Sequence, residues 1–365
     1  MTLDSNRPVR IWLLTGCALI AAMVTIGGIT RLTGSGLSIT EWDVVTGALP
    51  PLSEAHWQEL FARYQATPQY QQINAHFGLG DFKRIFWWEY IHRGLGRAIG
   101  LVFLVPFLFF LVKGYFNRPL RNRVLLIFGL GAFQGVLGWL MVASGLVDRP
   151  SVSHYRLAAH LLTALLTFGV TLWVALTLAG RRAGGQADDL LSARIRAALT
   201  GFAVLLGLQL MYGAFVAGLR AGGMFNTFPL MGGALVPPGL GTLTPAWRNL
   251  TENPVMVQFI HRLLGFLLLG LGVWLWPRLT RAGYSRHGRL LGIAVILQFL
   301  LGVVTILRFP ASPVFWGAVH QAGAVFLLTA VVLALHATRR LVLPDTVESP
   351  APGRVASGRL VPTDP

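Results

Sequence analysis

Eight long apolar segments, separated by polar stretches, dominate the chain. About 20 consecutive apolar residues suffice to cross a bilayer as a helix, and each segment is close to that length or longer. The pattern therefore predicts an all-α membrane protein with eight transmembrane helices. The spans are expected at 11–29, 85–112, 124–145, 157–180, 197–219, 255–277, 290–308 and 314–337.

Composition agrees with this pattern. Hydrophobic residues make up 54% of the 365 residues and charged residues only 12%, and the mean hydropathy is +0.61. This is more apolar surface than a soluble domain of this length buries in a core. The single cysteine, Cys17, lies within the first span and cannot form an intramolecular disulfide, and nothing in the chain builds a Cys-rich metal site.

The first outer loop, 30–84, carries two features. A Gly- and Thr-rich stretch at 27–36 predicts a turn whose backbone can approach a ligand closely. Further along, four aromatic or aliphatic residues recur at helical spacing opposite charged ones, which predicts an interfacial helix and a candidate lid. The apolar face is Trp57, Leu60, Phe61 and Tyr64, and the charged face is Glu54, Glu59 and Arg63.

The net charge of +16 is distributed unequally between the two sides of the membrane. The two termini and the second, fourth and sixth loops between the spans hold 18 Lys and Arg against 6 acids. The first, third, fifth and seventh loops hold 9 Lys and Arg against 7 acids. Positive residues mark the cytoplasmic side, so both termini are expected there, facing anionic lipid and not nucleic acid. Only ten residues precede the first span, which leaves no room for a transit peptide. We therefore expect a multi-pass protein of the bacterial plasma (inner) membrane.

The chain contains an internal repeat. The segment 89–97 begins Glu-Tyr-Ile-His-Arg, and 258–265 begins Gln-Phe-Ile-His-Arg, each at the head of an apolar span. This repeat predicts two four-helix bundles related by a pseudo-twofold axis along the membrane normal. The N-terminal half is 1–184 and the C-terminal half 185–341, followed by a disordered cytoplasmic tail, 342–365.

Four histidines occupy matching positions in the two halves. His92 and His160 lie on different helices of the first half, at the same depth near the outer surface, and His261 and His320 repeat this arrangement in the second. Such pairs are typical of a haem held between facing helices, with one axial nitrogen from each ring. The alternatives are hydrogen-bonded packing residues and, less well supported, a zinc or copper site. The other histidines, expected at the surface or in loops, are His56, His76, His154, His287 and His336.

Arginines accompany these histidines. Arg93 and Arg262 directly follow His92 and His261, and Arg97 lies one turn deeper than Arg93. Guanidinium groups at the interface can bind the anionic propionates of haem, although snorkelling toward lipid headgroups is an alternative for Arg97.

One position distinguishes the halves. Glu89 lies three residues before the first motif histidine, and Gln258 lies three before its counterpart. A carboxylate can act as a base, proton relay or charge stabiliser, and an amide cannot move a proton. We therefore expect the reaction centre in the N-terminal half and a permanent redox cofactor in the C-terminal half. A salt bridge from Glu89 to Arg93 is the simpler alternative.

These motifs resemble haem A synthase, in its proteobacterial and mitochondrial branch. The resemblance rests on 27–38, 82–93, 155–161 and the repeated Ile-His-Arg, and it covers about 10 to 340. It implies an oxidoreductase that converts haem O into haem A for cytochrome oxidase assembly, oxidising a porphyrin methyl group through an alcohol to a formyl group.

The resemblance also implies residue roles. His92 and His160 would flank the haem O substrate, Glu89 would assist catalysis, and His261 and His320 would ligate a resident haem b. Another branch has a pair of cysteines in the first outer loop, which this chain lacks.

Two other functions fit part of the pattern. A two-haem b-type membrane electron-transfer cytochrome would need the same ligands but no Glu/Gln asymmetry. A duplicated transporter would place polar residues at the midplane, whereas the ionisable residues here stay near one surface. Expected partners are haem O, haem A and the lipid bilayer, with haem O synthase and an unidentified electron acceptor as candidates. Homo-oligomer formation is left open.

Overall fold

The computed structural model describes residues 6–41, 47, 49–145, 152–180 and 189–339. Within these residues, eight helices are long and apolar enough to cross a membrane, which confirms the predicted all-α membrane architecture. They are α1 (Arg7–Leu32), α3 (Leu79–Val112), α4 (Arg118–Gly145), α5 (His154–Leu178), α6 (Asp189–Gly218), α8 (Pro254–Arg281), α9 (Ser285–Arg308) and α10 (Pro313–Ala337).

Most of these helices extend beyond the predicted apolar spans. Helix α3 begins at Leu79, six residues before its apolar stretch, where the backbone N–H of Gly78 donates to the Asp81 carboxylate at 3.1 Å. Hydropathy marks only where side chains turn apolar, whereas the backbone hydrogen bonds of a helix continue into the interface. The turn predicted at 27–36 is correct only in part, because α1 continues to Leu32 and the left-handed turn lies at Gly34, with φ of +69°.

The two halves have different internal packing. Helices α6, α8, α9 and α10 form a closed ring, in which each helix packs on the next and α10 packs again on α6. Helices α3, α1, α5 and α4 pack in that order and form an open arc. Among the described residues α3 meets α4 mainly through aromatic rings, with Phe107 4.8 Å from Phe128 between centroids.

The halves are joined along α1, α5, α6 and α10. The Gln321 amide of α10 donates to the Val24 carbonyl of α1 at 2.5 Å, and it occupies the space beside Gly28 that a larger residue would fill. At the end of α1, Arg31 donates to the Gly218 carbonyl of α6 at 2.7 Å. Backbone carbonyls of one half are thus bound by side chains of the other. The predicted pseudo-twofold relation of the halves stays a prediction.

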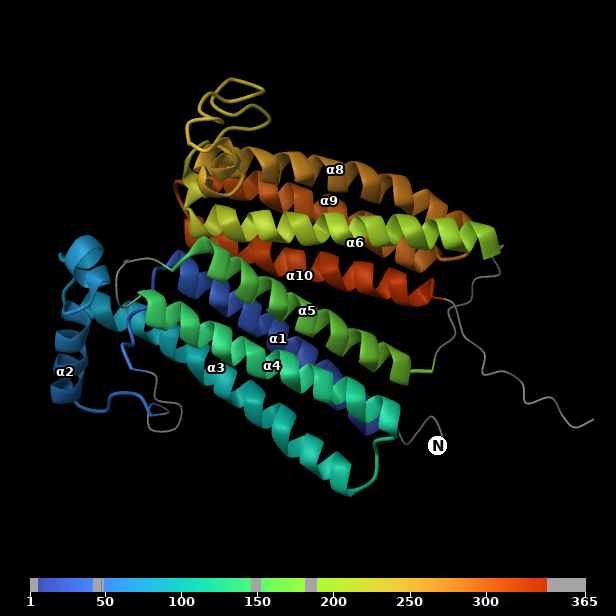
Figure 1. Ribbon diagram of the computed structural model, residues 1–365, viewed down its shortest axis with the longest axis horizontal. Coiled ribbons are helices and arrows are strands. Elements are labelled where there is room, and N and C mark those ends of the chain that lie inside the picture. Colours follow the sequence, from blue (N-terminus) through green and yellow to red (C-terminus); the bar gives the residue numbers. More distant parts are fainter. Residues whose placement is uncertain (1–5, 42–46, 48, 146–151, 181–188, 340–365) are drawn as a thin grey trace, which may run out of the picture.

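An amphipathic helix packs against the N-terminal end of α3. Helix α2 (Glu54–Gln65), followed by the π-helix η3 (Tyr70–Asn74), lies beyond one end of the membrane-crossing helices (Figure 1). Its buried Tyr64 stacks on Phe82 of α3 at 5.2 Å between centroids, and Trp57 meets Phe86 edge-on at 4.9 Å. Burial raises the pKa of the Tyr64 phenol, opposed in part by a hydrogen bond from Asn74. The helix predicted from the aromatic spacing is confirmed.

The corresponding loop of the C-terminal half is compact and largely irregular. It contains two short 3₁₀ helices, η4 (Ala221–Gly223) and η5 (Ala246–Arg248), and the single turn α7 (Asn249–Glu252). The buried Asn253 caps α8 and donates to the Gly239 carbonyl at 2.7 Å. An ion pair at 2.6 Å joins Arg248 to Glu252, and the hydrogen bond within it lowers the pKa of the Glu252 carboxyl.

Candidate functional site

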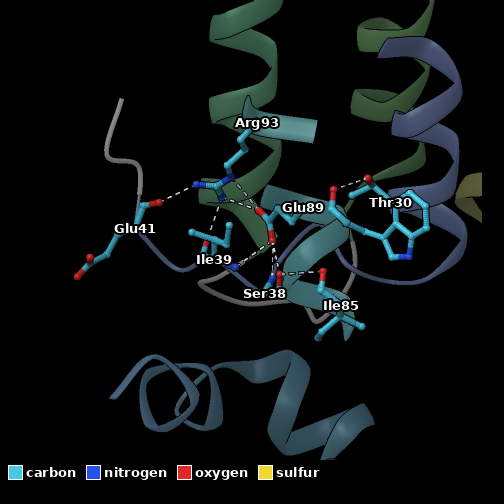
Figure 2. Close-up of polar contacts among 8 residues, drawn as sticks. Thr30, Ser38, Ile39, Glu41, Ile85, Glu89 and Arg93 are labelled. Atoms are coloured by element: carbon cyan, nitrogen blue, oxygen red, sulfur yellow. Dashed lines mark hydrogen bonds and ion pairs between the residues drawn. The ribbon is translucent and has the colours of Figure 1, made fainter. Parts of the chain in front are cut away.

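Glu89 lies at the centre of a buried polar cluster. Its side chain projects from α3 toward the segment that follows α1, and only 2% of the residue is exposed (Figure 2). Carboxylate oxygen Oε2 accepts hydrogen bonds from the Ser38 backbone N–H and hydroxyl, both at 2.7 Å, and from the Ile39 backbone N–H at 2.9 Å. An ionised carboxylate accepts hydrogen bonds at both of its oxygens, whereas a neutral amide accepts them at its oxygen alone.

Arg93 completes this cluster one helical turn later. Its Nη2 and Nε lie 2.6 and 3.0 Å from Glu89 Oε1, an ion pair that is almost wholly buried. The same guanidinium donates from Nη2 to the Ile39 carbonyl at 2.8 Å and from Nη1 to the Glu41 carbonyl at 2.7 Å (Figure 2). The salt bridge considered as the simpler alternative is therefore formed, and together the two charges fix 38–41 against α3.

The C-terminal half repeats the arginine contacts without the carboxylate. Arg262 donates from Nη2 to the Phe225 carbonyl at 2.7 Å and from Nη1 to the Thr227 carbonyl at 2.8 Å, again two carbonyls separated by one residue. Gln258, 2% exposed, donates its amide to the Phe225 carbonyl at 3.1 Å. Its carbonyl oxygen is buried and has no hydrogen-bond partner among the described residues. The Glu/Gln difference thus changes the local hydrogen bonding as well as the charge.

The second pair of histidines faces each other closely. The imidazole centroids of His261 on α8 and His320 on α10 are 6.4 Å apart, with ring planes at 83°. Two metal–nitrogen bonds of about 2.0 Å plus two imidazole ring radii add to roughly 6.3 Å. The spacing therefore fits a single iron between the rings, so these residues fit a bis-histidine haem.

Orphaned nitrogens provide a second test of fit. The Nδ1 atoms of His92, His160 and His261 are buried and without a hydrogen-bond partner among the residues that the structure describes. Buried polar atoms are usually hydrogen-bonded, and an exception calls for an explanation such as a bound metal or ligand. His320 differs, because the Gln298 amide lies 3.2 Å from its Nδ1.

Glutamines and glycines on neighbouring helices position the four imidazoles. The amides of Gln134 and Gln298 donate to the backbone carbonyls of His160 and His320, at 2.9 and 3.0 Å. A Cβ added to Gly27 would lie 3.0 Å from the ring of His92. The same addition at Gly213 or Gly302 would lie 3.2 Å from the rings of His261 or His320. These glycines leave the space that the rings occupy.

The predicted site residues are therefore brought together in two groups. Glu89 and Arg93 contact each other, and His92 lies on the same helix. The pairing of His92 with His160 stays a prediction. In the other half His261 faces His320, and Arg262 lies beside Gln258 through their shared acceptor, Phe225. The propionate contacts expected of Arg93, Arg97 and Arg262 stay predictions.

Sequence reasoning missed the partners from other segments. Ser38 is 51 residues from Glu89 in the chain, and Gln209 of α6, 3.4 Å from the His261 Nε2, is 52 residues from its histidine. The only signal for Ser38 was the small, polar character of the turn after α1. His154, predicted as a loop residue, is the first residue of α5, and its ring lies 5.3 Å from the Phe215 ring of α6.

Comparison with known proteins gives consistent matches over nearly the whole chain. Residues 10–332 match the COX15-CtaA family model, described as cytochrome oxidase assembly protein. A haem A synthase of Parvibaculum lavamentivorans is 48% identical over 334 residues, covering 91% of this chain and 95% of the relative. Haem A synthases of Nitrosospira multiformis and Bradyrhizobium diazoefficiens are 46% and 47% identical, covering 92% and 95% of this chain and 94% and 95% of their own lengths.

Proposed function

This chain belongs to the cytochrome oxidase assembly protein family, and we propose that it acts as a haem A synthase, a multi-pass membrane oxidoreductase that converts haem O to haem A. The observation that carries the proposal is the match to relatives of that name, which spans more than nine-tenths of the chain and of each relative. The facing histidines and the buried Glu89 give this chain the side chains that such an activity requires.

The reaction we propose oxidises one porphyrin methyl group of haem O through an alcohol to a formyl group. The conversion of a methyl to a formyl group removes four electrons and inserts one oxygen atom, so it needs an electron acceptor and an oxygen source, water or dioxygen, besides haem O. Haem O and haem A are both membrane-soluble, so the bilayer itself connects this protein to a haem O synthase. The expected setting is the bacterial inner membrane with both termini in the cytoplasm, as the charge distribution predicts.

His261 and His320 are the residues proposed to hold a resident haem b. Their ring spacing fits one iron, and Gln298 fixes the orientation of one imidazole through its Nδ1, as outer-shell partners of metal-binding histidines do. Haem b, when bound there, supplies one-electron transfer. Gly213 and Gly302 keep the neighbouring helices from displacing the rings.

His92 and His160 are proposed to bind the substrate haem O, with Glu89 as the acidic group of the reaction centre. Glu89 and His92 are three residues apart on α3 and so share a helical face. The five hydrogen bonds to the carboxylate hold Glu89 in one place, and they tie the loop after α1 to the same helix that carries His92. In this role the carboxylate positions the outer edge of the substrate site. Arg97 and Arg262 are proposed to bind propionates.

The second candidate is a two-haem cytochrome in which neither porphyrin is modified. Equal contacts of Arg93 and Arg262 with backbone carbonyls favour two haem sites of the same general form. The Glu89/Gln258 difference favours the enzyme, because two electron-transfer sites of one kind have no use for a carboxylate in one alone.

Haem analysis separates the two functions. The full chain is expressed with a haem O synthase in a bacterial host that makes no haem A, and haem is extracted with acidified organic solvent and identified by chromatography and mass. The synthase predicts haem A or its hydroxylated precursor, whereas the cytochrome predicts only haem b at both sites under every expression condition.

Matched variants then assign the halves. Glu89→Gln is expected to abolish haem A formation while the haem b spectrum remains. Glu252→Gln, in the turn α7 and away from the histidine pairs, is expected to leave both unchanged. His261→Ala is expected to remove the haem b spectrum and His92→Ala to leave it. The reverse result for the two histidines would exchange the proposed roles of the halves.

A further inference from the structure

A basic cavity lies at the end of the bundle away from the four histidines. It has a volume of about 980 Å³ and is lined by residues near the start of α1, the ends of α5 and α10, and the turn between α8 and α9. His336, on its wall, is sixteen residues after His320 on the same helix, a rise of roughly 24 Å. Figure 1 shows these four helix ends at the same end of the molecule, opposite α2. We propose that this cavity binds the phosphate headgroup of an anionic phospholipid.

The polar part of the cavity wall is basic. Arg10, Arg286, His287 and His336 line it, and no carboxylate does so among the residues that the structure describes. The Nε of Arg10 is buried and has no hydrogen-bond partner among the described residues. A buried guanidinium N–H without an acceptor is costly, and a phosphate oxygen is the acceptor that suits its geometry best.

Arg339 adds a further positive charge behind this wall. Its Nη1 contacts the Nε2 of His336 and lies 3.2 Å from the hydroxyl of Thr177 on α5. The His336 ring also meets Trp173 edge-on at 5.0 Å between centroids. The imidazole is thus held between α5 and α10, and Arg10 of one half and Arg286 of the other line the same cavity.

The rest of the wall is apolar, which favours a lipid over a free anion. Leu14 of α1, Leu176 of α5 and Leu333 of α10 line the same cavity as the basic groups. An acyl chain can lie against such side chains while its headgroup meets the arginines, and basic pockets between transmembrane helices bind anionic headgroups in this way. Because α1 and α5 belong to one half and α10 to the other, a bound lipid would bridge the two.

The test measures lipid binding by the purified full-length protein in detergent, independently of haem chemistry. Phosphatidylglycerol, phosphatidylcholine and inorganic phosphate are added separately, and binding is followed by native mass spectrometry and by the thermal unfolding midpoint. The test variant is the double substitution Arg10→Gln with Arg286→Gln. The matched control is Arg118→Gln with Arg121→Gln, two exposed arginines on α4 outside the cavity.

Phosphatidylglycerol is expected to bind the wild type and raise its unfolding midpoint more than phosphatidylcholine does. Each basic residue near a membrane surface contributes about 1 kcal/mol to anionic lipid attraction, so the double variant should bind roughly twentyfold to thirtyfold more weakly, and the control should not change. Should the double variant fail to fold, Arg286→Gln alone, at an exposed residue, should bind about fivefold more weakly. Unchanged affinity in the foldable variant, an equal response to phosphatidylcholine, or a full response to inorganic phosphate alone would overturn the proposal.

Discussion

The ion pair between Glu89 and Arg93 should contribute far more to stability than its sequence spacing suggests. Pairs four residues apart on a helix surface stabilise by only about 0.3–0.5 kcal/mol. Here the side chains of Glu89 and Arg93 are 3% and 10% exposed, and two backbone carbonyls accept two further guanidinium N–H groups. Removing one partner from a buried pair leaves the other charge uncompensated and costs about 3–5 kcal/mol.

A double-mutant cycle isolates this interaction. The variants are Glu89→Gln, Arg93→Gln and the two combined, and the measurement is the free energy of unfolding of the purified protein in detergent titrated with sodium dodecyl sulfate. The expected coupling energy is about 2–3 kcal/mol, the upper range for residues in one buried network. In the single variant Glu89→Gln, the amide is expected to donate to the Ile39 carbonyl, as Gln258 does to Phe225.

The chain supplies its own control pair. Glu59 and Arg63 on α2 have the same i,i+4 spacing and a distance of 2.7 Å, but their side chains are 56% and 41% exposed. Solvent screening should reduce their coupling to about 0.5 kcal/mol or less. If the buried pair couples no more strongly than this surface pair, the reasoning from burial is refuted.

Two further results follow from the packing. Gly213→Val should crowd the His261 ring and weaken haem b retention about 10-fold to 100-fold, measured as haem bound per protein, whereas Gly207→Val on the same helix, where an added Cβ meets nothing within 4 Å, should retain it. Burial raises the pKa of the Tyr64 phenol, so the neutral phenol stabilises the docked α2 at pH values below the unfolded pKa of about 10. That contribution is lost as the pH rises through the higher pKa of the folded state. Trp57 fluorescence should change as α2 undocks at alkaline pH, and Tyr64→Phe should abolish this pH dependence of the fluorescence.

The sequence predicted the membrane helices well because hydropathy is a local property. All eight apolar spans are helical, since a lipid-facing backbone must satisfy its hydrogen bonds within the segment. The ends were less accurate: α4 begins at Arg118 where the apolar span begins at 124, because a helix need not stop where its side chains become polar. The Ile-His-Arg repeat identified His261, whose ring faces His320.

The hydropathy pattern could not predict contacts between segments that are far apart in the sequence. Nothing in the periodicity around Ser38 indicates that its N–H and hydroxyl bind a carboxylate 51 residues away. His287 was set aside as a surface residue and His336 because it lies far from His320 on the same helix, whereas folding brings the two to one cavity. The position of Glu89 was found from the repeat, but its five donors depend on how the chain after α1 folds back onto α3.

The closed ring and the open arc hold their peripheral helices by different numbers of interfaces. To separate α9 from its neighbours, the packing against both α8 and α10 must be broken. Helix α4 packs closely along its length on α5 alone, apart from the aromatic contacts with α3, and its departure disturbs one interface among the described helices. A single helix pairing, between α8 and α9 in one half and replaced by a few aromatic contacts between α3 and α4 in the other, thus decides how many interfaces must part before a peripheral helix can move.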